Sequence, residues 1–182
     1  SEVEKVVKEM EDLARENERL AREIVKDVER LVREIEDTVR RSVETTRRLV
    51  EEIRELAERG VDERELERFL KEIEERNRKS REDLDRLLEK IERKVRKVDR
   101  DSDRSLERIR RRIDDVRRKI NSDERVLELL ERVLRELEKV VEDSKRRIKE
   151  VLDELRKAVD KVKKEDKKVH DELRKVVEEV RT

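Results

Sequence analysis

Proline is absent from the 182 residues of this chain, and the single glycine is Gly60. Proline breaks helices and glycine weakens them, so almost every stretch of the sequence is compatible with a helix. Aromatic residues amount to only 1% of the chain. The composition therefore predicts an all-helical protein, interrupted only where turn-forming residues occur.

The first interruption lies around the glycine. Gly60 suits the left-handed position that ends a helix, and Asp62 is placed to cap the helix that follows. Glu65 stands three residues after Asp62, the spacing of a capping box, and Ser1 and Glu4 repeat that spacing at the start of the sequence. These residues predict two helix starts and one helix end.

The second interruption lies near residue 121. Asn121 tolerates the left-handed position, and Ser122 or Asp123 is the expected cap of the next helix. Together the interruptions predict helices over residues 2–59, 63–120 and 123–181.

Apolar residues recur in steps of three and four that average about 3.5, the repeat of left-handed coiled coils. Turns this short place consecutive helices antiparallel. The sequence therefore predicts an all-α fold with three long antiparallel helices in a left-handed, coiled-coil-like, up-down-up bundle. We expect one domain over residues 1–182.

Charged residues make up 59% of the chain, with 54 Lys and Arg against 54 Asp and Glu. With no net charge and no separate basic block, the sequence predicts no nucleic-acid or anionic-membrane partner. Cysteine is absent, which excludes disulfides and thiolate metal ligands. No apolar run has the length of a membrane span or a signal-peptide core, so we expect a soluble chain without a targeting segment, whose compartment stays unknown.

The apolar stripe of each helix is interrupted twice, and antiparallel pairing brings these interruptions to the same two levels. Short polar side chains at the stripe positions predict two hydrogen-bonded layers across the bundle. The first layer is predicted to contain Asn17, Ser102, Ser105 and Ser144. The second is predicted to contain Thr38, Ser42, Thr45, Thr46, Asn77, Ser80, Asp166 and His170.

These layers are expected to fix the register of the helices. The positions of the turns place Asn17 beside Ser105 and Ser42 beside Ser80. A helix shifted by one heptad would still bury apolar residues, but it would strand polar groups at about 1 to 3 kcal/mol each.

His170 is the only histidine, and Asp166 precedes it by one helical turn. A metal site needs three or four converging ligands, so we interpret His170 as a structural residue and expect no metal site. No serine or threonine has a base arranged beside it, and one glycine cannot form a phosphate-binding loop. The sequence therefore predicts no catalytic residue, no cofactor and no enzymatic activity.

Near-equal helices, complete cap signals, a surface saturated with charge and polar layers occur together over the whole chain. In these features it resembles de novo designed helical bundles with buried hydrogen-bond networks. The resemblance implies a structural scaffold with no natural substrate and no required partner. The alternative is an interaction module that binds a designed partner helix or a second copy on the broader apolar stripes of the first and third helices, which include residues 126–134. Those stripes could equally face each other.

Overall fold

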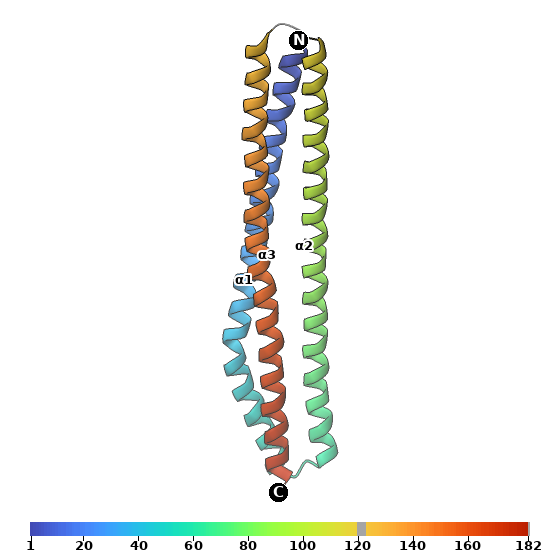
Figure 1. Cartoon of the computed structure of the whole chain (residues 1–182). Coiled ribbons are helices and arrows are strands. Elements are labelled where there is room, and N and C mark those ends of the chain that lie inside the picture. The colour runs from blue at the N-terminus through green and yellow to red at the C-terminus, as the bar shows by residue number, and fades with distance from the viewer. Residues whose placement is uncertain (120–122, 182) are drawn as a thin grey trace. The chain divides into compact units, whose positions relative to one another are not determined.

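A computed structural model describes residues 1–119 and 123–181, and every element in this part is an α-helix. The helices are α1 (Glu2–Glu58), α2 (Glu63–Lys119) and α3 (Glu124–Arg181), labelled in Figure 1. The predicted all-α fold of three long helices is confirmed, and the predicted bounds agree to within one residue. The predicted end of the second helix at Ile120 lies outside the described residues.

The end of α1 has the geometry that the glycine predicts. Gly60 has a φ of +78°. Its N–H donates to the carbonyl of Ala57 at 3.1 Å, and the N–H of Val61 donates to the carbonyl of Leu56 at 3.1 Å. This pair of bonds is a Schellman motif, which satisfies two of the carbonyls left free at a helix end.

Both predicted N-caps at the described helix starts are present. Asp62 Oδ1 accepts the backbone N–H groups of Arg64 at 2.8 Å and Glu65 at 3.1 Å. Ser1 Oγ accepts the N–H of Glu4 at 3.3 Å. Each cap satisfies donors that have no partner within the first turn of a helix, which explains why α1 and α2 begin where they do.

Only part of the second turn can be compared with its prediction. Asn121 and Ser122 lie outside the described residues. Asp123 directly precedes α3, and its carbonyl accepts the N–H of Leu127 at 3.4 Å, the first bond of that helix.

The residues group by contact into two compact units, and each unit contains a segment of all three helices. Unit 1 comprises Ser1–Glu29 and Ile91–Asp153, and unit 2 comprises Arg30–Lys90 and α3 from Glu154 onward. The single bundle expected for the whole chain stays a prediction.

In unit 1 the residue numbers of paired positions rise along α1 and fall along α2. Arg112 pairs with Glu9, and Ser102 pairs with Asn17 further along α1. The α1 and α2 segments are therefore antiparallel. The α2 and α3 segments are antiparallel as well, as shown by the ion pairs Arg117 with Glu131, Arg110 with Glu138 and Asp103 with Lys145.

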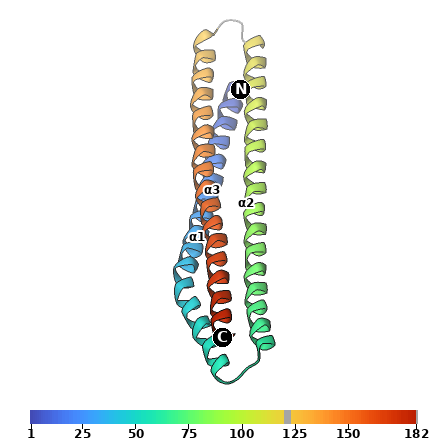
Figure 2. The same cartoon turned by 60° about the horizontal axis from the view of Figure 1, so that its bottom comes forward.

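Unit 2 has the same up-down-up order. Asp85 pairs with Lys163 at 3.2 Å, and Glu67 pairs with Arg174 at 3.3 Å, so α2 and α3 run antiparallel. Figure 2 shows the short connection from α1 into α2, which belongs to this unit; it makes those two segments antiparallel and leaves α1 and α3 parallel.

Each unit has a core assembled from all three helices at coiled-coil spacing. The core of unit 1 includes Val6, Met10, Leu106, Ile109, Ile113, Val116, Leu130, Leu137 and Val141. The core of unit 2 includes Ile53, Leu66, Leu70, Ile73, Val169, Leu173, Val176 and Val177.

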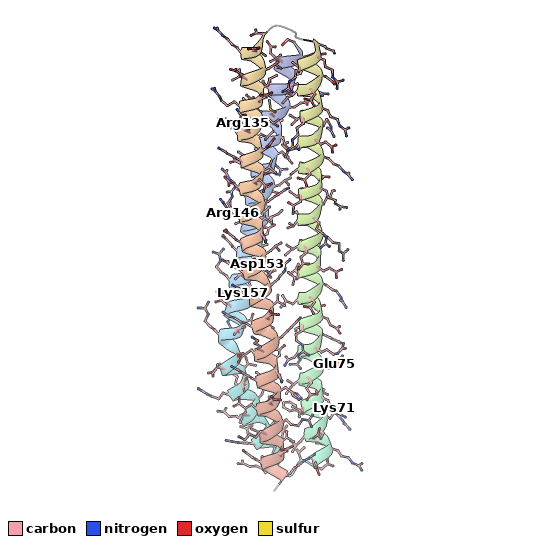
Figure 3. All side chains as sticks on the ribbon, in the orientation of Figure 1. Lys71, Glu75, Arg135, Arg146, Asp153 and Lys157 are labelled. Carbon is pink, nitrogen blue, oxygen red and sulfur yellow. The ribbon has the colours of Figure 1, made fainter. Side chains whose placement is uncertain are left out.

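Charged side chains project from all three helices in Figure 3, among them the labelled Arg135, Arg146 and Lys157 of α3. Many form pairs one turn apart on the same helix, such as Arg19 with Glu16 and Glu23. Such exposed pairs contribute about 0 to 1 kcal/mol each, so the cores supply most of the stability. Within the described residues, no helix combines the length and the apolar character needed to cross a membrane.

Candidate functional site: the polar layers

Three polar residues of unit 1 are buried in the first predicted layer. Asn17 and Ser102 are each 4% exposed, and Ser144 is 1% exposed. The Asn17 Nδ2 group donates a hydrogen bond to Ser102 Oγ at 2.8 Å, joining α1 to α2. The predicted neighbour Ser105 is half-buried one helical turn from Ser102, so Asn17 bonds the other serine of the layer. The pairs Glu9 with Arg112 and Glu2 with Lys119 lie at the register that the turns predict.

Ser144 brings α3 to the same level. Ser102 is followed by Asp103, and Ser144 is followed by Lys145. Lys145 Nζ donates to Asp103 Oδ1 at 2.6 Å, so the two serines lie next to residues that are in direct contact. All three helices therefore place a small polar side chain at this level of unit 1.

The first layer contains one hydrogen bond between side chains and two buried polar atoms without a partner. These atoms are Asn17 Oδ1 and Ser144 Oγ. A buried polar atom without a partner costs about 1 to 3 kcal/mol. The layer is thus less completely bonded than the bundle-spanning network expected from the sequence.

A charged group lies next to this layer between α2 and α3. Burial raises the pKa of Asp99, the positive charge of Lys145 lowers it, and the negative charges of Asp103 and Glu142 raise it further. Burial also lowers the pKa of Lys145, but the hydrogen bond and charge of Asp103 outweigh this and leave that pKa raised. Folding therefore disfavours the charged form of the Asp99 carboxyl group.

The second predicted layer, in unit 2, has one buried member. Thr46 is buried, whereas Thr38, Thr45 and Ser80 are exposed and do not take part in a buried layer. The remaining predicted members are half-buried: Ser42, Asn77, Asp166 and His170.

The hydroxyl groups of α1 in this stretch bond mainly to their own helix. Thr38 Oγ1 donates to the carbonyl of Glu34 at 2.9 Å, and Thr46 Oγ1 donates to the carbonyl of Ser42 at 2.7 Å. Ser and Thr commonly bond to a carbonyl one turn earlier in this way. Such a bond satisfies the hydroxyl and removes its need for a partner on another helix.

Bonds between helices in unit 2 use carboxylates that the sequence analysis did not single out. Ser42 Oγ lies 2.8 Å from Glu165 Oε1 of α3 and 2.6 Å from the carbonyl oxygen of Val39, and its one proton can go to either acceptor. The predicted neighbour Ser80 is exposed. Glu74 Oε1 of α2 lies 2.8 Å from His170 Nδ1 of α3. Glu165 and Glu74 both lie where the apolar stripes are interrupted, which is the signal that could have identified them.

Asp166 and His170 do not converge on one point. Asp166 faces Arg81 at 3.8 Å, and His170 pairs with Glu74. Burial raises the pKa of Asp166, the charge of Arg81 lowers it, and the charge of Glu165 raises it. In the described part of the chain, no three His, Cys, Asp or Glu residues are grouped as metal ligands would be.

A groove of about 740 Å³ lies between α2 and α3 in unit 2, along the interrupted stretch. The apolar residues Leu70 and Leu173 line it and are themselves fully buried. Charged and polar side chains make up most of its wall, including Asn77, Arg81 and Asp166. The groove is therefore a gap in apolar packing that water and dissolved ions can reach.

Comparison with known proteins gives one description of the chain. No model of a protein family matches it, and no curated protein sequence matches it. Among solved structures it is similar to a computationally designed three-helix bundle. The two share 22% sequence identity with a TM-score of 0.49, over 98% of this chain and 87% of the other.

Proposed function

We propose that the chain is a structural scaffold, with no natural substrate and no catalytic activity, in which the polar layer of unit 1 sets the register of the helices. The observation that supports this is the buried bond between Asn17 of α1 and Ser102 of α2. It is a specific contact between helices, in a core that is otherwise assembled from a nearly uniform apolar repeat.

The uniform repeat makes other registers competitive. Sliding α2 by one heptad brings Val95 or Ile109 to the position of Ser102, and both of these residues are buried in the observed register. Apolar packing would survive such a shift along most of the interface. The amide of Asn17 would lose its partner, at a cost of about 1 to 3 kcal/mol, so the polar layer penalises the shifted register.

The test removes the layer while keeping an apolar core. A variant with Asn17→Leu, Ser102→Ala and Ser144→Ala is expected to match or exceed the parent in guanidinium resistance, because buried polar groups usually stabilise less than apolar packing. The same variant should lose uniformity and give mixed species in light scattering. The matched control is Thr38→Ala with Thr45→Ala and Ser80→Ala, whose parent residues are exposed.

A different outcome would assign the layer another role. If the core variant unfolds several kcal/mol more easily and remains a single species, the layer is a stabilising element and the proposal is wrong. If the exposed control loses uniformity to the same extent, burial of the polar groups is not the cause.

The alternative is a module that binds another helix or a second copy through α1 and α3. It has less support, because most of the apolar cluster near the start of α3 packs against the core of unit 1. Leu129 is the member of that cluster that stays on the surface, at 51% exposure. Single exposed apolar residues are ordinary on folded proteins and do not by themselves indicate an interface.

A further inference from the structure

The middle of α2 lacks buried residues over an unusually long stretch. Ile73 is 7% exposed, and the next buried residue of α2 is Val95, at 8%. Every residue between them is half-buried or exposed. In unit 2 this stretch comprises residues 74–90, and it is the part of α2 in that unit without a buried residue.

The other two helices of unit 2 are anchored again sooner. The interrupted stretch of α1 ends at Thr46, which is buried, and that of α3 ends at Val169. Within the unit, α2 itself is anchored before the interruption by Leu66, Leu70 and Ile73. Residues 74–90 therefore lie in the interval between Ile73, the last buried residue of this packed segment, and Val95, the next buried residue of α2.

Charge pairs with α3 hold this stretch instead of apolar packing. Glu74 contacts both His170, at 2.8 Å, and Arg174, at 3.2 Å. Further along α2, Arg81 pairs with Asp166 at 3.8 Å and Asp85 pairs with Lys163 at 3.2 Å.

Solvent reaches these pairs. The side chains of Lys163 and Asp85 are 47% and 50% exposed, and the groove of about 740 Å³ runs past Glu74, Arg81 and Asp166. Exposed pairs of this kind are weak individually and are screened by dissolved salt, whereas apolar packing is not.

We infer that residues 74–90 of α2 form an electrostatic latch, which opens away from α3 as a local unit while residues 63–73 stay packed, and whose opening is set by ionic strength. A helical stretch that is only half-buried has little stability of its own in water, so its backbone bonds break when the charge pairs release it. The inference does not depend on the proposed role of the polar layer, because that layer lies in unit 1.

Hydrogen exchange measured by mass spectrometry tests the latch in the intact chain. Peptides covering residues 74–90 are compared with peptides covering residues 98–116 of the same helix in unit 1, where a buried residue occurs in every turn. We expect residues 74–90 to exchange faster at low salt. Raising the sodium chloride concentration from 0.05 M to 1 M should accelerate that exchange about fivefold or more, as screening weakens several pairs together. The reference peptides should change little.

A pair of variants separates the bonds between helices from charge in general. Glu74→Gln removes the carboxylate that contacts His170 and Arg174 of α3. Glu82→Gln is the matched control, because Glu82 pairs with Arg78 and Arg86 on α2 itself. We expect Glu74→Gln to speed exchange over residues 74–90 about threefold and to reduce its dependence on salt, and Glu82→Gln to leave both near the parent values.

Two results would overturn the latch. Residues 74–90 that exchange as slowly as residues 98–116, or at a rate that does not respond to salt, would show that other contacts hold this stretch. Equal acceleration by the two variants would show that α2 responds to charge within the helix and not to its pairs with α3.

Discussion

Ser102 and Ser144 lie in the same buried layer, but their hydroxyl groups differ in what they bond. Ser102 accepts the hydrogen bond of Asn17, whereas Ser144 Oγ has no partner. We expect Ser102→Ala to lower the free energy of unfolding by about 1 to 3 kcal/mol, because it strands a buried amide. Ser144→Ala should be neutral or stabilising. Urea unfolding of the two variants measures the difference, and equal losses would contradict this account of the layer.

Asp99 offers a prediction about pH, because burial raises its pKa above the ordinary value of 3.8. A raised folded-state pKa means that folding favours the protonated form, so this carboxyl destabilises the fold increasingly as pH rises through that pKa. Asp99→Asn should therefore raise the free energy of unfolding at pH 7 by about 0.5 kcal/mol, a small value because the group is partly exposed. The gain should shrink as the pH falls toward 4.

The control for Asp99 is Asp101→Asn, since Asp101 is exposed on the same helix. Urea unfolding at several pH values should show a smaller gain for Asp101→Asn. A gain for Asp99→Asn that is constant from pH 7 to pH 4 would show that burial of the carboxylate is not its source.

For single residues, the sequence predicts which positions interrupt the apolar repeat. It does not predict the hydrogen-bond partners of their side chains. Asn17 and Ser102 were identifiable because they occupy core positions of two helices that the turns bring together. Thr38 failed as a layer residue because its hydroxyl bonds to a carbonyl one turn earlier. Glu74 and Glu165 were not recognised because charged residues fill the surface and do not stand out in the sequence.

Among the elements, the turn at Gly60 allows the effect of backbone conformation on stability to be measured separately from the effect of steric contacts. A Cβ placed on Gly60 would meet no atom within 4 Å, but its φ of +78° is one that L-residues disfavour. Gly60→Ala should therefore cost about 1 kcal/mol in urea unfolding, as conformational strain alone. Gly60→Asn is the comparison, and it should cost less because asparagine tolerates this conformation. If both variants cost the same, the left-handed conformation is not what selects glycine here.

Helices, their bounds and their antiparallel order were predictable because the evidence for them is local. Gly60 and Asp62 mark one turn unambiguously when no proline and no other glycine compete with them. The division of α2 into a firmly packed end and a loosely held middle was less evident. The apolar stripe is interrupted after Ile73, and the spacing predicts that it resumes at Leu84 and Leu87. The structure leaves Leu84 half-buried and Leu87 exposed.

For the whole molecule, we predict a monomer. The apolar cluster at the start of α3 is largely used within unit 1, which leaves Leu129 as its exposed member. Light scattering over a wide range of protein concentration should give one constant mass. A mass that rises with concentration would favour the interaction module, and Leu129→Glu should then restore the monomer if the exposed Leu129 forms the contact.

The stretch of α2 without buried residues also shows that positions of the sequence differ in how strongly folding restricts the residue they can hold. A position that is not fully buried constrains its side chain weakly, so most residues between 74 and 94 should accept replacement by other helix-forming residues. The residues that pair with α3 are the exceptions. A saturation library scored for folding would find its most permissive helical positions there. A foreign sequence, such as an antibody epitope or a labelling tag, should therefore replace residues of this stretch with less effect on folding than elsewhere in the helices.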